Sequence, residues 1–153
     1  HSFGLGCLHT ALYSGSTLVL LKNANNLEQI LTSLKKYKIT TLAAIPATLT
    51  KILNFDNKKI EDYFSEIRLI ITNSTSVPKK TVLQFKEILK KGNLATYYGL
   101  TEASRSTFMI FDKDNHRRSH SRNVFHQHNQ EHRLVCSHFH SEQLRIAVVS
   151  FRV

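Results

Sequence analysis

Short apolar runs that alternate with amphipathic helical patterns constrain the fold of this chain more than any other feature. The runs lie at residues 17–21, 40–45, 68–72, 94–98 and 107–111. Continuous runs of this length are typical of strands that are buried on both faces of a sheet. Helical patterns are expected at 2–14, 26–38, 46–53, 60–64 and 79–91. Strands that alternate with helices predict an α/β fold with a mostly parallel sheet flanked by helices.

Residues at the ends of the helical patterns support these boundaries. Gly15 is expected to end the first helix, and Asn26 is a candidate N-cap for the second. Pro46 is expected to open the third helix, because proline is tolerated in the first helical turn. Gly92 is expected to end the last helix.

The charge distribution argues against a nucleic-acid partner, although the net charge is +10. Residues 1–115 carry 15 basic and nine acidic side chains, and their lysines are scattered along helical faces, which is typical of a solvated surface. The cysteines Cys7 and Cys136 have no metal-site or redox spacing, so we expect thiols in a reducing, cytoplasmic setting. No apolar run approaches the roughly 20 residues of a membrane span, so we expect none.

The composition changes after Asp114. All 13 lysines and all five glycines precede this point, whereas seven of the nine histidines follow it. We therefore expect one partial domain over residues 1–114 and a poorly ordered His/Arg-rich segment, frame-shifted or unrelated, over 115–153. A metal-binding tail is the alternative, because His-x-His spacing can chelate zinc. The candidate ligands are His126, His128, His132, His138 and His140.

The stretch Tyr-Tyr-Gly-Leu-Thr-Glu-Ala-Ser at 97–104 concentrates the chemistry that binds a nucleotide. A tyrosine ring can stack on a base, a glycine lets the backbone approach a ligand, a hydroxyl can bond a phosphate and a carboxylate can hold Mg2+. Ligands of parallel sheets sit beyond the carboxyl ends of strands, so Thr72 and Tyr98 are expected at one edge. The same residues could instead form a strand end, a turn and a helix cap.

The sequence Tyr-Gly-Leu-Thr-Glu at 98–102 resembles a signature of the adenylate-forming superfamily, which includes acyl-CoA synthetases, luciferase-like ligases and peptide-synthetase adenylation domains. Two further segments match this superfamily, at 1–6 and 67–78, so the resemblance covers about residues 1–112. It implies part of the large N-terminal domain of an acyl-CoA synthetase-like fold. The implied enzyme uses ATP and Mg2+ to convert a carboxylic acid into acyl-AMP, and then usually transfers the acyl group to coenzyme A.

The resemblance also implies roles for single residues in the nucleotide site. Tyr98 would stack on adenine, and Gly99 would leave room for it. Thr101 would bond the α-phosphate and Glu102 would bind Mg2+, which makes these two the catalytic candidates.

A polar turn and the start of the chain would complete the site. Ser74, Thr75 and Ser76 would line the nucleotide, although the family favours Gly-Gly-Ala or similar there, so these bulkier residues put the pocket width in doubt. The acyl pocket would be bordered by His1, Phe3 and Gly4.

Several parts of the implied enzyme have no counterpart in this sequence. A phosphate loop would precede His1, and a ribose-binding Asp and a small C-terminal domain with a catalytic Lys would follow residue 114. We therefore expect a ligase fragment that is inactive alone and whose partners are a small carboxylic acid, a nucleotide and the missing parts of the same enzyme. The alternative is a non-catalytic α/β module that binds a nucleotide or a protein.

Overall fold

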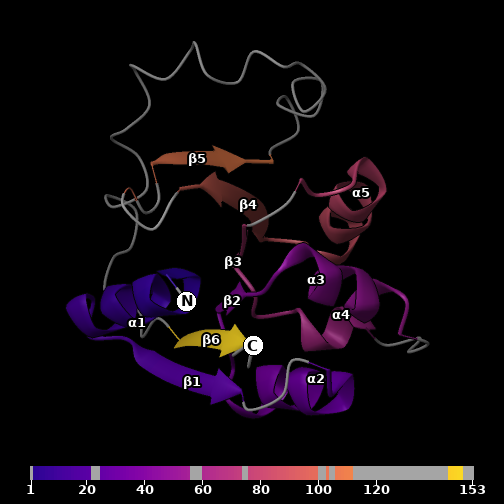
Figure 1. Ribbon diagram of the computed structural model, residues 1–153. Coiled ribbons are helices and arrows are strands. Elements are labelled where there is room, and N and C mark those ends of the chain that lie inside the picture. The colour runs from indigo at the N-terminus through magenta and orange to yellow at the C-terminus, as the bar shows by residue number, and fades with distance from the viewer. Residues whose placement is uncertain are drawn as a thin grey trace.

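The computed structural model of the chain describes residues 2–21, 25–55, 60–73, 76–99, 103, 106–111 and 145–149. In this part, helices and strands alternate along most of the chain (Figure 1). The strands are β1 (Thr17–Leu21), β2 (Thr41–Ala43), β3 (Leu69–Thr72), β4 (Asn93–Tyr98), β5 (Thr107–Ile110) and β6 (Arg145–Val149). The helices are α1 (Ser2–Tyr13), α2 (Leu27–Lys36), α3 (Pro46–Leu53), α4 (Ile60–Tyr63) and α5 (Lys79–Ile88).

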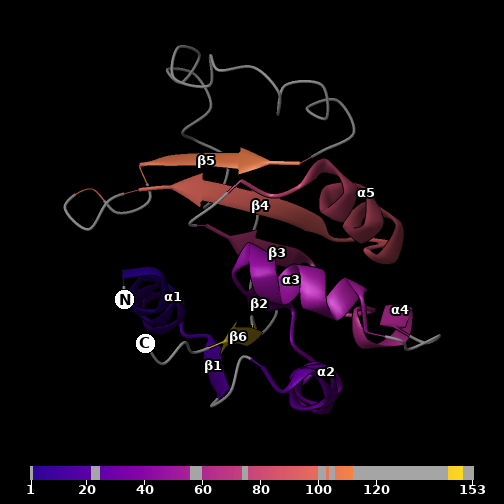
Figure 2. The ribbon, with the colours of Figure 1, turned by 45° about the vertical axis from the view of Figure 1, so that its right-hand side comes forward.

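All six strands belong to one sheet, in the order β1-β6-β2-β3-β4-β5. Every neighbouring pair is parallel except β4 and β5, which are antiparallel. The predicted α/β fold with a mostly parallel sheet is therefore confirmed. The helices lie on both faces of the sheet, with α1 on one face and α2, α3, α4 and α5 on the other (Figure 2).

Each face of the sheet packs a separate hydrophobic core. The larger core joins the sheet to α2, α3 and α5, and its fully buried members include Ile30, Leu42, Leu49, Ile70 and Phe85. The smaller core lies under α1 and consists of Phe3, Cys7, Ala11, Ala43 and Tyr97, with Leu18, Ile71 and Phe108 packed against it. Alternate residues of a strand point to opposite faces, so β2, β3 and β4 each contribute to both cores.

The start of α2 confirms the predicted cap. The Asn26 side-chain oxygen accepts a hydrogen bond from the Gln29 backbone N–H at 2.9 Å. This bond satisfies one of the donors that the first helical turn leaves unpaired. Lys35 and Lys36 lie in the last turn, where cations complement the partial negative charge of the helix end.

The ends of α1 and α2 share one backbone geometry but differ in the residue that adopts it. Gly15 has φ of 63° after α1, and the Ser16 N–H donates to the Ala11 carbonyl at 2.8 Å, which closes the helix end. Lys38 occupies the equivalent position after α2 with φ of 48°. A left-handed backbone suits glycine and is costly for lysine, because a Cβ crowds the neighbouring carbonyl oxygen.

Gly92 does not end a helix, so the prediction for this residue is wrong. Helix α5 ends at Ile88, and Gly92 lies beyond it, directly before β4. A Cβ at Gly92 would lie 2.5 Å from the backbone oxygen of Ile67. The glycine is therefore required for close approach of two backbones, at the point where the Asn93 N–H donates to the Arg68 carbonyl at 2.9 Å.

Strand β6 comes from the segment that we expected to be poorly ordered. All five of its residues pair in parallel with β1 on one side, and Ile146, Ala147 and Val148 pair in parallel with β2 on the other. The expectation is therefore wrong for Arg145–Val149. The rest of the segment, with the five candidate zinc-ligand histidines, lies outside the described residues.

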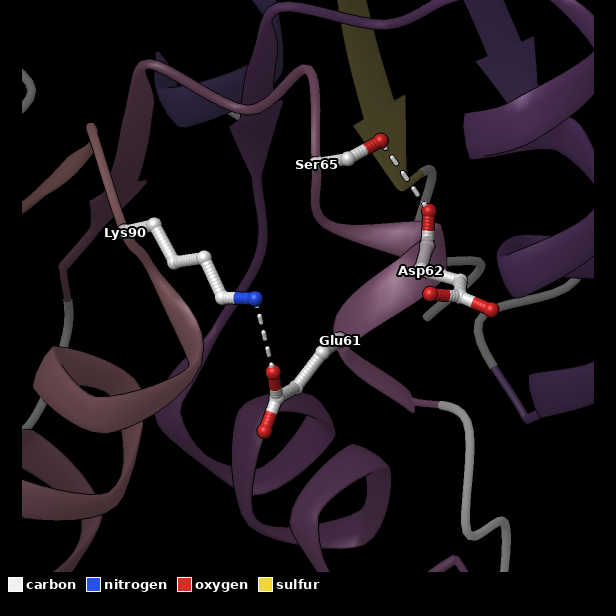
Figure 3. Close-up of polar contacts among 4 residues, drawn as sticks. All are labelled: Glu61, Asp62, Ser65 and Lys90. Carbon is white, nitrogen blue, oxygen red and sulfur yellow. Dashed lines mark hydrogen bonds and ion pairs between the residues drawn. The ribbon is translucent and has the colours of Figure 1, made fainter.

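An exposed ion pair joins α4 to the chain after α5. The Lys90 ammonium lies 3.2 Å from Oε2 of Glu61, and the Ser65 hydroxyl donates to the Asp62 carbonyl at 3.1 Å (Figure 3). The Lys90 and Glu61 side chains are 76% and 55% exposed, so solvent screens their attraction.

None of the described helices has the length and apolar character needed to cross a membrane.

Candidate functional site

Two parallel strands bring Thr72 and Tyr98 to one edge of the sheet. β3 ends at Thr72 and β4 ends at Tyr98, and the register pairs Thr72 with Thr96. Both carboxyl ends therefore lie at the same edge, as predicted. This edge is the place where open parallel sheets bind their ligands.

Consecutive tyrosines at the end of β4 point to opposite faces of the sheet. Tyr97 belongs to the core under α1 and is only 6% exposed. Tyr98 shares the opposite face with Leu94, a member of the larger core, and is 54% exposed. Gly99, which follows, is also exposed. An exposed aromatic ring at this edge can offer a face to a planar base.

The end of β3 contributes two polar side chains that differ in their hydrogen bonding. The Asn73 side-chain amide donates a hydrogen bond to the Tyr97 hydroxyl at 3.3 Å. The Thr72 hydroxyl is fully buried and has no hydrogen-bond partner within the part of the chain that the structure describes. A buried hydroxyl without a partner loses its hydrogen bonds to water and forms none within the protein, which destabilises the folded state.

The amino-terminal end of α1 reaches the same edge from the other face of the sheet. The Phe3 ring lies 5.8 Å from the Tyr97 ring, measured between centroids, and is buried. Gly4, the next residue, borders open space, since a Cβ there would have no neighbouring atom within 4 Å. The structure thus brings Phe3 and Gly4 near the end of β4, with Phe3 packed as a core residue.

Five of the predicted site residues lie outside the described residues: His1, Ser74, Thr75, Thr101 and Glu102. Ser76 is described and is exposed, three residues before α5 begins. Across the connection to β5, the Ser106 hydroxyl donates to the Ala103 carbonyl at 2.6 Å. Within the described ranges, no three His, Cys, Asp or Glu side chains gather to form a metal site.

Sequence reasoning did not single out the contact between Asn73 and Tyr97. Strand alternation alone indicates that Tyr97 and Tyr98 face opposite ways. The partner of Tyr97 depends on the register of β3 against β4, which neither strand specifies by itself.

Known proteins that resemble this chain are acyl-CoA ligases and luciferase-like enzymes. Acyl-CoA synthetase 7 of Caenorhabditis elegans is 25% identical over 109 residues, which cover 71% of this chain and 20% of that protein. The long-chain-fatty-acid–CoA ligase of Haemophilus influenzae is 29% identical over 106 residues, which cover 68% of this chain and 18% of that protein. The chain thus spans about a fifth of the length of these curated relatives.

A solved structure shows a partial likeness to the fold. The luciferase-like enzyme of the nonluminescent Zophobas morio mealworm matches 60% of this chain and 21% of its own, at 22% identity and a TM-score of 0.47.

The family model described as AMP-binding enzyme matches residues 1–133. The match includes the edge formed by β3 and β4, and it runs past residue 114, where we expected the domain to end. Because the matched range is most of the 153-residue chain, the chain belongs to the family of AMP-binding enzymes.

Proposed function

We propose that this chain is part of an ATP-dependent ligase that activates a carboxylic acid as acyl-AMP and then transfers the acyl group to a thiol such as coenzyme A. The family and the names of the two ligase relatives support this assignment. The observation that carries it is the exposed Tyr98 ring at the carboxyl edge of the parallel sheet, followed by Gly99.

Each residue of the motif has a role in this proposal. Tyr98 stacks on adenine, and the missing side chain of Gly99 leaves room for the base. Thr101 donates its hydroxyl to the α-phosphate. Glu102 holds the Mg2+ ion, which neutralises phosphate charge when bound. Positioning and charge neutralisation are the main demands of substitution at phosphorus, and these residue types meet them.

In this proposal the acid binds beside α1, on the face of the sheet opposite Tyr98. The segment with His1, Phe3 and Gly4 borders the acyl group, and the turn with Ser74, Thr75 and Ser76 lines the nucleotide.

The chain covers about a fifth of its relatives, so it is expected to be inactive alone. Catalytic groups that act as a unit lose nearly all effect when one member is absent.

Binding of AMP to the purified chain tests the base-stacking role directly. Isothermal titration should show weak binding to the wild type and a loss of about fivefold or more in Tyr98→Ala, because stacking on an aromatic ring contributes about 1–3 kcal/mol per base. Tyr13→Ala is the matched control, since Tyr13 is also an exposed tyrosine but ends α1, away from this edge. Equal losses in the two variants, or no AMP binding to the wild type, would refute the proposal.

Pyrophosphate exchange with ATP, Mg2+ and a panel of carboxylic acids tests the expected inactivity. The wild-type chain should give background exchange. Exchange above background that disappears in Glu102→Ala would show that the chain contains a working active site, and that its inactivity was wrongly expected.

A further inference from the structure

Three aromatic rings from three elements meet under α1 at the carboxyl edge of the sheet. Tyr97 of β4 lies 5.8 Å from Phe3 of α1 and 5.4 Å from Phe108 of β5, measured between ring centroids. Phe3 is 3% exposed and Tyr97 is 6% exposed. We call Phe3, Tyr97 and Phe108 the aromatic plug, because these rings fill the space between α1 and the end of β4.

A hydrogen bond from the neighbouring strand holds the central ring of the plug. The Asn73 amide donates to the Tyr97 hydroxyl at 3.3 Å, from the residue directly after β3. Tyr97 is therefore held at its ring by aromatic contacts and at its hydroxyl by a polar contact. Moving this ring would break the hydrogen bond and both ring contacts together.

The plug lies on the opposite face of the sheet from the ring proposed to stack on adenine. Tyr97 and Tyr98 are consecutive in β4, so a ligand that reaches around the end of the strand from Tyr98 meets Tyr97 and α1 next. Gly4, beside Phe3, borders open space rather than the packed interior. Gly4 thus leaves open space beside Phe3, whereas the space between α1 and the end of β4 is occupied by rings.

We infer that the aromatic plug limits the length of the acid, so that the site accepts short or compact carboxylic acids and excludes long alkyl chains. This inference rests on the proposed function, in which Phe3 and Gly4 border the acyl group. Tyr97 is the residue that determines the limit, and Asn73 is a positioning residue that acts through it. A long chain would have to displace Tyr97, whereas a short acid stops before reaching it.

Alkyl esters of AMP provide probes that combine the base with chains of different length and do not react. In an open apolar pocket, affinity rises about fourfold for each buried methylene, since each contributes about 0.8 kcal/mol. Titration of the wild-type chain should show no such rise between butyl-AMP and dodecyl-AMP. Tyr97→Leu should bind dodecyl-AMP at least tenfold more tightly than the wild type does, with butyl-AMP affinity little changed.

A second aromatic pair provides the matched control. Phe64 and Phe85 also lie 5.8 Å apart, but in the larger core on the other face of the sheet. Phe85→Leu should lose comparable packing and gain no affinity for dodecyl-AMP. Asn73→Ala keeps the Tyr97 ring but removes its polar contact, so it should shift the length preference in the same direction as Tyr97→Leu, by a smaller factor. Far-UV circular dichroism verifies that each variant is folded.

The outcomes separate this inference from the proposed function. If butyl-AMP binds and depends on Tyr98, but dodecyl-AMP binds the wild type far more tightly, the length limit is wrong and the proposed function stands. A Tyr97→Leu variant that is folded and gains nothing, or gains no more than Phe85→Leu, also overturns the length limit. If neither AMP nor any ester binds, the proposed function fails and the inference fails with it.

Discussion

Replacing Thr72 by valine should stabilise the protein, although the substitution removes a hydrogen-bonding group. The Thr72 hydroxyl is fully buried and has no partner among the described residues. An unsatisfied buried group costs about 1–3 kcal/mol, and valine has nearly the same shape with a methyl group in place of the hydroxyl. The free energy of unfolding should therefore rise by about 1–3 kcal/mol, since valine also suits a buried strand.

Urea denaturation followed by far-UV circular dichroism measures this change, and Thr50→Val is the control. The Thr50 hydroxyl donates to the Pro46 carbonyl at 3.1 Å, so its removal should lower the free energy of unfolding by about 1 kcal/mol. The two variants remove the same atom and should change stability in opposite directions. If Thr72→Val lowers stability as much as Thr50→Val does, the Thr72 hydroxyl has a partner and the reasoning from its burial is refuted.

Three further predictions concern the backbone and the surface, each measured as a change in the urea midpoint. Gly15→Ala should destabilise by about 1 kcal/mol and Lys38→Gly should stabilise by up to about 1 kcal/mol, because both residues have a left-handed backbone; changes of equal sign would contradict this account. Gly92→Ala should cost about 1–3 kcal/mol, because its Cβ would strike a backbone oxygen; a neutral result would show that the backbones can separate. Lys90→Ala should change stability by less than about 1 kcal/mol, because its ion pair with Glu61 is exposed; a larger loss would mean that solvent screening is overestimated.

Local patterns were sufficient to predict the first five strands and the helices. Continuous apolar runs and one-sided helical stripes report burial directly, so β3 and α2 appear close to their expected positions. The edge that joins Thr72 to Tyr98 was predictable for a related reason, since parallel strands share a direction. Side-chain contacts such as the hydrogen bond between Asn73 and Tyr97 could not be predicted. They depend on the register of β3 against β4 and on how α1 packs on the sheet.

Strand β6 was missed because composition was given more weight than local pattern. The surrounding segment is rich in histidine and arginine and has no glycine, which suggested that it could not pack. Arg-Ile-Ala-Val-Val at 145–149 is nevertheless a short apolar, β-branched run of the kind that forms a buried strand. For Gly92 the error was the reverse, because the local pattern was given too much weight. Glycine commonly ends helices, but the constraint at Gly92 comes from the backbone of Ile67, which is distant in sequence.

The position of β6 also determines the order in which this chain can fold as it is synthesised. β1 and β2 are adjacent in sequence but are separated in the sheet by β6, and Thr17 pairs with Arg145. Strands β2 to β5 can assemble early, because their pairings with one another all lie within one continuous stretch of the chain. The unit of α1 and β1 has no strand partner among the described residues until the ribosome has passed residue 145. Until β6 is made, the edge of β2 is open to other strands, so the nascent chain is prone to aggregate during that interval.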